Sequence, residues 1–370
     1  MASLIDILGW RNISTSITAV ESGVPNRLPP ALMNTTEDVL GDRTTYITFY
    51  GQRQTPKQSA YGAQSKARAQ KPMGEKSVAL LHFPEHIKIR QELLERLRNP
   101  NDLLAQVMAQ NELARAGADF RQLFDNGRIV AITSGLANAG KIWIDSSGNI
   151  LPTSSGAALT IDPVVHANNQ NQLNGIIDAS WATASTNIIQ HLTNIKIQAR
   201  KNTGREIVHA FYGKNVAAYM FNNTTLGKYW QFNAKMYEAF SATPDMIPEG
   251  FAGLKWHFMG DSFYNDSADT TQNIWGNDLV TFTPEINRNT YTLFNGSMTV
   301  PKIGAGTVEG SLIAATGAFD TVYGMGGYAV PEVDPVGIKA VYFDTFLPVF
   351  KTAAVNGTGA GDFFYATVAF

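Results

Sequence analysis

Apolar side chains recur at the spacing of one helix face between residues 103 and 124. The repeating positions are Leu103, Leu104, Val107, Met108, Ala114, Ala118, Phe120, Leu123 and Phe124. This spacing predicts a long amphipathic helix of about 25 residues or more, roughly 40 Å in length. Asn99 is suited to cap the helix and Pro100 to fill its first turn. Asn126-Gly127 is a local stop signal, but the apolar rhythm continues toward Gly135, so we expect the helix to continue.

Two apolar strands flank a long polar segment upstream of this helix. Residues 44–50 alternate around Ile47, and residues 77–83 form a second apolar run. Together they predict a two-stranded loop whose outer part is the polar segment. Pro84 then predicts the start of a short helix that reaches about Arg98.

The rest of the chain mixes short helices and strands. We expect a short helix over residues 1–10 and, because of Gly23, Pro25, Pro29 and Pro30, an irregular limb over residues 11–40. The expected strands are 141–145, 150–151, 207–211, 254–258, 279–282, 291–294, 337–350 and 363–370, and the expected helices are 183–200, 215–221 and 229–240. Residues 156–180, 260–278 and 304–317 predict loops. A chain of 370 residues is long enough for two or three cores.

Residues 43–76 are locally basic in a chain whose formal net charge is −2. Their basic residues are Arg43, Arg53, Lys57, Lys66, Arg68, Lys71 and Lys76, and their acid is Glu75. Between Gly51 and Gly74 the bulky apolar side chains are Tyr61 and Met73, so this arm cannot bury enough surface to order itself. The arm is either a nucleic-acid strap or a limb laid on a neighbouring subunit. We favour the limb, because base stacking needs more aromatic residues than Tyr61.

The amino-acid composition bears on oligomeric state and excludes several classes of chemistry. Charged residues make up 16% of the chain, against roughly 25% in ordinary soluble domains. A surface with few charged groups costs less free energy to desolvate, and this favours a protein that buries part of its surface in an oligomer. The absence of cysteine excludes thiolate chemistry and fits a reducing cytoplasm. No apolar run approaches the roughly 18 residues of a membrane span, and the N-terminus lacks the basic region of a secretory signal.

The motifs that could carry chemistry are incomplete. Gly135 to Ile142 approximates a phosphate-binding loop, but Ile142 stands where a metal-binding hydroxyl is required. His82 and His86 have zinc-like spacing with Pro84 between them, and His166, His191, His209 and His257 stand alone in the sequence. Asp261, Asn265, Asp266 and Asp269 crowd one loop without the spacing of a calcium site. We therefore expect no catalytic residue, no cofactor and no metal, with a weak ion site in the acidic loop left open.

The order of arm, extended loop, long helix and terminal strand resembles the major capsid proteins of tailed bacteriophages, in particular the lambda-like capsid protein E family. Four stretches carry the resemblance: SVALLHFPEHIKI (77–89), ITSGLANAGKIWIDSSGNIL (132–151), FYGKNVAAYMFNN (211–223) and DPVGIKAVYFDTFLPVF (334–350). The resemblance implies an α+β, Hong Kong 97-like fold. Its parts would be an N-terminal arm (1–40), an extended β-hairpin loop (41–83), a peripheral domain with a spine helix and sheet (84–155 and 325–370), and an axial α/β domain (156–324).

The resemblance also implies a structural protein that self-assembles into hexamers and pentamers of an icosahedral phage head enclosing the genome. Partners would be further copies of the chain, with scaffolding, portal and decoration proteins as additional candidates and DNA contacted non-specifically at most. The residues expected to contact adjacent subunits are Arg53, Lys57, Tyr61, Lys66, Arg68 and Lys71. The virion would be its final location, after synthesis and assembly in the host cytoplasm. A tail-tube subunit and, because of residues 183–221, an α/β enzyme remain as alternatives.

Overall fold

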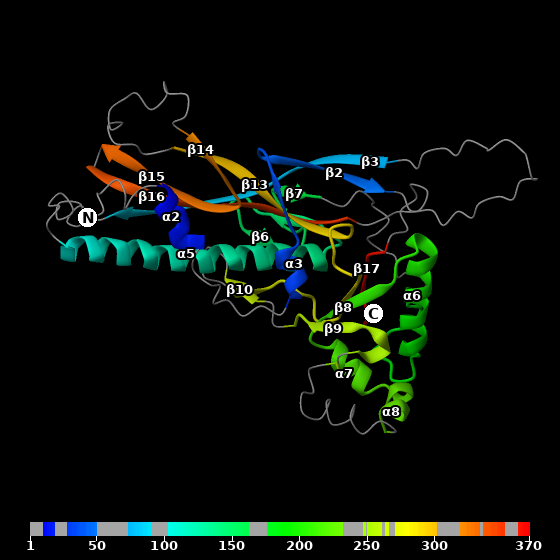
Figure 1. Cartoon of the computed structure of the whole chain (residues 1–370). Helices are drawn as coiled ribbons and strands as arrows, with labels where there is room; N and C mark the ends of the chain where they lie inside the picture. Colours follow the sequence, from blue (N-terminus) through cyan, green and yellow to red (C-terminus); the bar gives the residue numbers. More distant parts are fainter. Residues whose placement is uncertain are drawn as a thin grey trace, which may run out of the picture.

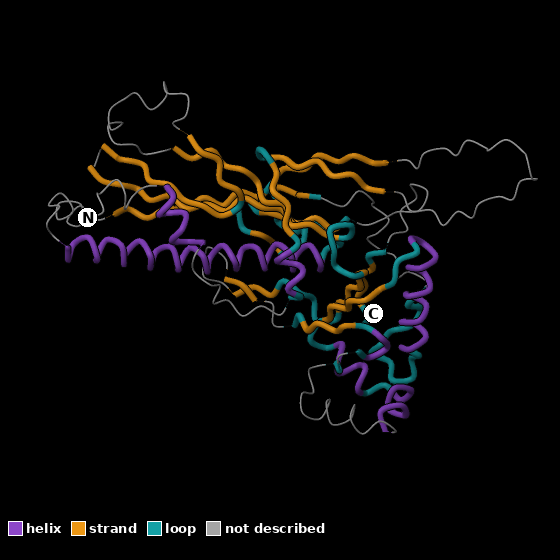
Figure 2. The backbone as a smooth tube through the Cα atoms, viewed as in Figure 1, coloured by secondary structure: helices purple, strands orange, loops and turns teal. Residues whose placement is uncertain are grey.

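A long helix under a layer of strands, with a smaller unit at the C-terminal end of that helix, makes up the molecule (Figure 1). The computed structural model describes residues 10–18, 28–49, 73–89, 103–162, 176–231, 247–248, 250–260, 263–265, 271–301, 319–333, 336–351 and 362–370. The tube view shows the same arrangement, with most strands on one side of the long helix (Figure 2). The mixed α+β class predicted from the sequence is confirmed.

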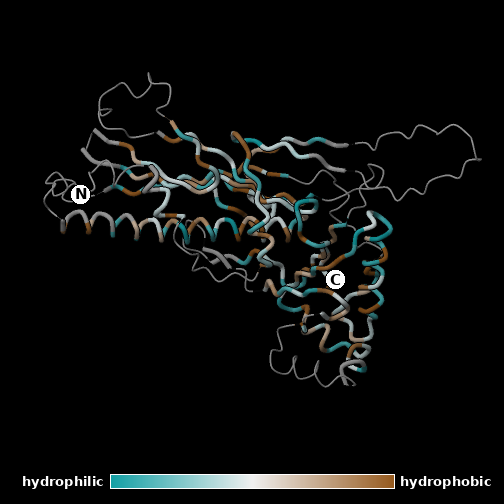
Figure 3. The backbone as a smooth tube through the Cα atoms, viewed as in Figure 1, coloured by the Kyte–Doolittle hydropathy of each residue, from teal (hydrophilic) through white to brown (hydrophobic). Residues whose placement is uncertain are grey.

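The long helix, α5 (Leu103–Ala137), contains 35 residues, or about 52 Å at the usual rise per residue. It passes through Asn126 and Gly127 without a break, which confirms the predicted continuation. Its last turns are buried at Val130, Ile132 and Leu136. Packing of these turns therefore outweighs the local preference for a stop. Hydrophobic residues recur along α5 and through the strands above it (Figure 3).

The large sheet is built around β16 (Val336–Phe350), a strand of 15 residues that confirms the strand predicted at 337–350. Its residues from Tyr342 to Phe350 are all buried, so burial does not alternate there. This strand pairs antiparallel with three others, namely β4 (Leu81–Ile89), β13 (Tyr291–Pro301) and β15 (Met325–Val333). Strand β13 also pairs parallel with β1 (Thr36–Val39) and antiparallel with β14 (Phe319–Tyr323). Sequence-distant segments are thereby joined in one sheet over α5.

Helix α5 is fixed to this sheet by a buried ion pair and an aromatic contact. The Arg128 guanidinium donates through Nε and Nη2 to the two carboxylate oxygens of Asp344 on β16, each at 2.7 Å. Burial alone lowers the pKa of Arg128, but the charge and hydrogen bonds of Asp344 raise it overall. Nearer the middle of α5, the ring of Phe120 lies 4.8 Å from that of Tyr342. These contacts set both the position and the rotation of the helix.

The smaller unit contains a four-stranded sheet in the order β17-β12-β8-β9. Its strands are β8 (Ile207–Tyr212), β9 (Lys255–Phe258), β12 (Leu279–Pro284) and β17 (Phe364–Thr367), and its helices are α6 (Ile188–Thr203), α7 (Val216–Phe221), α8 (Thr224–Gln231) and the 3-10 turn η2 (Phe251–Gly253). The Gln190 amide donates to Asn187 Oδ1 at 3.2 Å, and Gly204 ends α6 in the left-handed conformation. Trp181, Trp256 and Phe282 belong to the core of this unit.

Short elements complete the fold. A three-stranded sheet consists of β5 (Ile142–Ile144), β6 (Ile150–Leu151) and β7 (Leu159–Ile161), and a two-stranded one of β10 (Phe263–Asn265) and β11 (Thr271–Asn273). The pairing of β5 with β6 confirms the strand-turn-strand predicted for residues 141–151. Strands β10 and β11 lie in the region predicted to be a loop, so that prediction was wrong for those residues.

The helix predicted after Pro84 is wrong up to Ile89, because these residues belong to β4. Pro84 lies opposite Phe343 of β16. Among the described strands, β4 pairs with β16 alone, so its other edge has no partner strand. A proline, which has no amide hydrogen to donate, is tolerated in such an edge strand. Residues 90–98 of the predicted helix lie outside the described residues.

The irregular limb predicted for residues 11–40 is also partly wrong. Helix α2 (Trp10–Thr18) lies against β15 and α5, and α3 (Pro30–Asn34) precedes β1. Ser14 Oγ donates to the carbonyl of Gly327 at 3.0 Å, and Ile17 is fully buried. The prolines and glycine that indicated irregular chain lie beyond Thr18, so they did not bear on α2.

Candidate assembly surfaces

Strands β2 (Arg43–Phe49) and β3 (Met73–Ala79) form a two-stranded antiparallel ribbon. The register places Arg43 opposite Ala79 at one end and Phe49 opposite Met73 at the other. In Figure 1 the ribbon leaves the edge of the strand layer and points away from the body. The two-stranded loop predicted from the sequence is confirmed in its paired part.

The inner end of this ribbon is anchored in the core of the large unit. Tyr46, Val78 and Leu80 are buried there, and the Leu80 amide donates to the carbonyl of Asp42 at 2.8 Å. Burial, and secondarily the charge of Asp162, raises the pKa of the Tyr46 hydroxyl well above its usual range. The inner end of the ribbon is thus held by uncharged, buried side chains.

The residues predicted to contact neighbouring subunits all lie between the outer ends of β2 and β3. They are Arg53, Lys57, Tyr61, Lys66, Arg68 and Lys71, and all of them fall within residues 50–72, outside the described residues. The register of the ribbon does establish where this segment begins and ends. Its two ends are the paired residues Phe49 and Met73.

A second exposed surface lies on the N-terminal half of α5. Leu104, Val107 and Met108 follow helical spacing, and their exposed fractions are 69%, 52% and 46%. Leu123 farther along the helix is 49% exposed. Residues three and four positions apart share one helix face, so the first three side chains form an apolar stripe. The predicted amphipathic helix is present, but its apolar face is exposed at these positions in the single chain.

The histidines divide into a structural one and an unexpected pair. His191 accepts from Trp181 Nε1 at 3.1 Å through Nδ1, and its Nε2 lies 2.7 Å from Asp178 Oδ1, as a hydrogen-bonded structural histidine would. His209 and His257 stand alone in the sequence, but the fold brings them together: His209 Nδ1 lies 2.9 Å from His257 Nε2. The pair is created by the parallel pairing of β8 with β9, which no local sequence signal reveals.

The motif at residues 135–142 does not have the geometry of a phosphate-binding loop, as the sequence indicated. Helix α5 ends at Ala137 and strand β5 begins at Ile142, so no helix starts after Lys141 as a phosphate-binding loop requires. Within the part of the chain that the structure describes, no cluster of three or more His, Asp or Glu side chains has metal-binding geometry. No described helix is both long and apolar enough to cross a membrane. Asp261, Asp266 and Asp269 lie outside the described residues.

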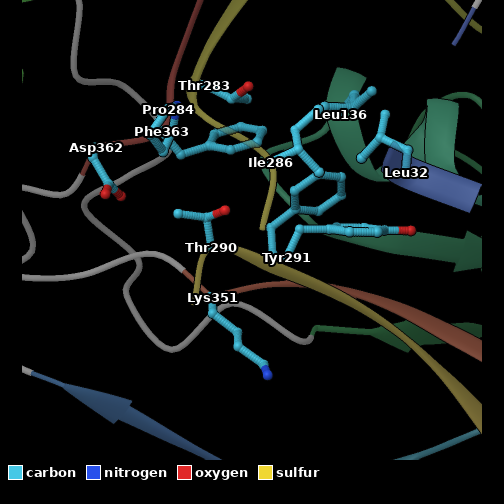
Figure 4. A pocket seen from close by; sticks show the side chains of 11 residues that line it. Leu32, Leu136, Thr283, Pro284, Ile286, Thr290, Tyr291, Lys351, Asp362 and Phe363 are labelled. Carbon is cyan, nitrogen blue, oxygen red and sulfur yellow. The ribbon is translucent and has the colours of Figure 1, made fainter. Parts of the chain in front are cut away.

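One small pocket lies where α3, the end of α5 and the β12–β13 connection meet. Figure 4 shows Leu32, Leu136 and Ile286 grouped around it and the Lys351 side chain pointing away. Its volume is about 10 Å³, which holds about one water molecule. The pocket is therefore a packing defect of the core with no room for an organic ligand.

Comparison with known proteins gives a family match. The family model described as phage major capsid protein E matches residues 42–296, which is more than half of the chain. This range includes the β2–β3 ribbon, α5 and the helices of the smaller unit. A sequence comparison with curated proteins gave no match.

Solved structures of low similarity were also found. A phage-related protein from Bordetella bronchiseptica RB50 is 9% identical, with 97% of this chain and 96% of that chain covered and a TM-score of 0.45. The capsid of cyanophage Pam1 is 11% identical, with 95% and 94% covered and a TM-score of 0.42. The mature capsid of bacteriophage PhiM1 is 11% identical, with 94% and 89% covered and a TM-score of 0.41. At these scores, assignment to a family rests on the sequence match.

Proposed function

This chain belongs to the phage major capsid protein E family, and from that premise we propose that it self-assembles into the hexamers and pentamers of an icosahedral phage head. The family makes it a structural protein of the virion. The match over residues 42–296 carries the proposal, because it spans the ribbon, the spine helix and most of the smaller unit. No observation on the described residues favours a tail-tube subunit or an α/β enzyme in its place.

The β2–β3 ribbon supports a specific mode of assembly. An isolated two-stranded ribbon is marginally stable in water, and this one is anchored at its inner end by Tyr46, Val78 and Leu80. We propose that residues 50–72 lie on an adjacent copy of the chain and contact acidic or polar side chains on its surface. The residues proposed to make these contacts are Arg53, Lys57, Tyr61, Lys66, Arg68 and Lys71. Such a contact joins different surfaces of the two copies, which is the head-to-tail geometry of a closed ring.

The division of the chain into domains is also a proposal. We propose an N-terminal arm at residues 1–40, an extended loop at 41–83, a peripheral domain at 84–155 and 325–370, and an axial domain at 156–324. Strand pairing adds that β1 and β13 belong to the large sheet and β17 to the small one. The chain therefore crosses between the units more often than this linear division implies.

The remaining proposals follow from a structural role. The protein has no catalytic function, and its main partner is a further copy of the same chain. Scaffolding, portal and decoration proteins are additional partners, and packaged DNA is contacted non-specifically at most. Synthesis and assembly take place in the host cytoplasm before the protein becomes part of the virion.

Electron microscopy of the purified protein tests the function directly. Negative-stain images are expected to show capsomers or closed shells. Tubes would instead indicate a tail protein, and small separate particles under all assembly conditions would contradict the proposal.

A charge variant tests the role of residues 50–72 without shortening the chain. Replacing Arg53, Lys57, Lys66, Arg68 and Lys71 by Gln is expected to reduce shell yield strongly, because their contacts with the neighbouring copy are lost. The matched control replaces Arg115, Lys201, Lys214, Lys228 and Lys339 by Gln and makes the same change in net charge. Equal shell yields from the two variants would refute a specific contact.

A further inference from the structure

The His209–His257 pair lies on the face of the small sheet that is turned toward α5. Strand register places Phe211 opposite both Thr281 on β12 and His257 on β9, and directly opposed residues share one face of a sheet. On that same face, Thr281 Oγ1 donates to the carbonyl of Leu136 in α5 at 3.0 Å. The pair therefore belongs to the junction between the small sheet and the spine helix.

The two imidazoles are packed as well as hydrogen-bonded. Their ring centroids are 5.2 Å apart and stacked, and the His257 ring lies 4.9 Å from Phe211. His209 is 4% exposed, so its ring is almost fully removed from water. The contact links β8 to β9, the outermost strand of this sheet.

This geometry requires specific protonation. A hydrogen bond between two imidazoles needs one donor nitrogen and one acceptor nitrogen, so at least one ring must be neutral. His209 Nε2 is buried without a hydrogen-bond partner and lies 3.8 Å from Glu285 Oε2. A proton on Nε2 facing the carboxylate is more favourable than a lone pair, so we assign the bond as His257 Nε2 donating to His209 Nδ1.

The surrounding charges favour the neutral pair. Among the described residues, the charged groups that face it are Lys255 on β9 and Glu285 after β12, and these lie 3.7 Å from each other. The Glu285 carboxylate is thus shared with Lys255 and is not free to compensate a charged ring. Burial, followed by the charge of Lys255, lowers the pKa of His209 to about 4. Burial, followed by the charges of His209 and Lys255, lowers the pKa of His257 to about 4.

We propose that the His209–His257 pair is an acid-sensitive joint that holds β9 on β8. When one of the two imidazoles is protonated, the contact still has one donor nitrogen and one acceptor nitrogen, so the hydrogen bond remains. A second proton removes the acceptor and places two like charges in contact. Strands β8 and β9 then separate at this point. This property goes beyond shell formation and does not depend on it.

The direction of the pH effect follows from linkage. Each ring has a lower pKa in the folded protein than in the unfolded chain, whose histidines titrate near 6.5. The unfolded chain therefore binds more protons between about pH 6.5 and pH 4, and stability falls as the pH is lowered through that window. For one ring with a folded pKa of about 4, the opening equilibrium shifts by about 30-fold between pH 7.5 and pH 5.

Hydrogen–deuterium exchange on the full-length chain tests this joint. Amide protection in residues 255–258, corrected for the intrinsic effect of pH, is expected to fall about 30-fold more in the wild type than in His257→Gln between pH 7.5 and pH 5. Glutamine can still donate and accept but does not titrate. The matched control, His86→Gln, changes an exposed histidine of β4 and is expected to behave as the wild type. Equal loss of protection in the wild type and His257→Gln would overturn the proposal.

A measurement on the wild type covers the case in which His257→Gln does not fold. Nuclear magnetic resonance with labelled histidine is expected to show two imidazoles that titrate below pH 5. Titration of all six histidines at or above pH 6 would overturn the joint.

Discussion

At the scale of single residues, the fold depends on a charged pair in its most apolar region. Asp344 is fully buried within β16, between side chains of the large core. Both of its oxygens accept from Arg128, which also donates to Asn295 Oδ1 at 3.3 Å. Because the pair is buried, removing one partner leaves the other charge buried without its counter-ion. The pair therefore fixes α5 in position on the sheet.

Asp344→Ala is expected to lower the free energy of unfolding by about 3–5 kcal/mol. The matched control is Glu206→Gln, which breaks the exposed ion pair between Arg200 and Glu206 and is expected to cost no more than about 1 kcal/mol. Urea unfolding of dispersed subunits measures both. A loss for Asp344→Ala no larger than that of the control would show that the buried pair does not anchor the helix.

At the scale of elements, two of the three glycines in α5, Gly117 and Gly127, lie in different surroundings. A Cβ at Gly117 would lie 2.6 Å from the carbonyl oxygen of Ser16 in α2, whereas a Cβ at Gly127 would meet nothing within 4 Å. Gly117 thus allows α2 to approach the spine helix closely. Gly127 has no such role and only weakens the helix.

The two glycines provide a prediction with opposite signs on one helix. Gly127→Ala is expected to stabilise the subunit by about 0.5–1 kcal/mol through helix propensity. Gly117→Ala is expected to destabilise it by about 1–3 kcal/mol, because α2 must move away. Thermal unfolding of dispersed subunits gives both values. A stabilising Gly117→Ala would mean that α2 does not lie against α5 at Ser16.

Periodicity in the sequence was sufficient for the elements that carry their own pattern. Helix α5, strand β16 and the paired strands β2 and β3 were predicted, because each contains its signal within a few turns or residues. Strand β4 was predicted only as far as Phe83, since Pro84 is a helix-start signal locally. The proline is tolerated because β4 is an outer strand among those described. The His209–His257 pair and the Arg128–Asp344 pair depend on contacts between residues far apart in sequence. Local patterns contain no information on such contacts.

At the scale of the whole molecule, the ribbon and the apolar stripe on α5 have the same implication. The described part of the ribbon is anchored at its inner end, and Leu104, Val107 and Met108 remain exposed in the single chain. Both features are unfavourable in an isolated subunit, and covering them with another protein surface stabilises the subunit. A protein of a capsid family acquires that cover from further copies of itself. The subunit is therefore expected to be less stable alone than in a shell.

Deletion of residues 55–72, followed by electron microscopy of the purified protein, tests this account most directly. The deletion leaves residues 50–54 to connect Phe49 with Met73, a length that suits an ordinary hairpin loop. The account predicts a soluble subunit with unchanged circular dichroism that forms no shells under conditions where the wild type does. Shells of normal number and size from the shortened chain would contradict it.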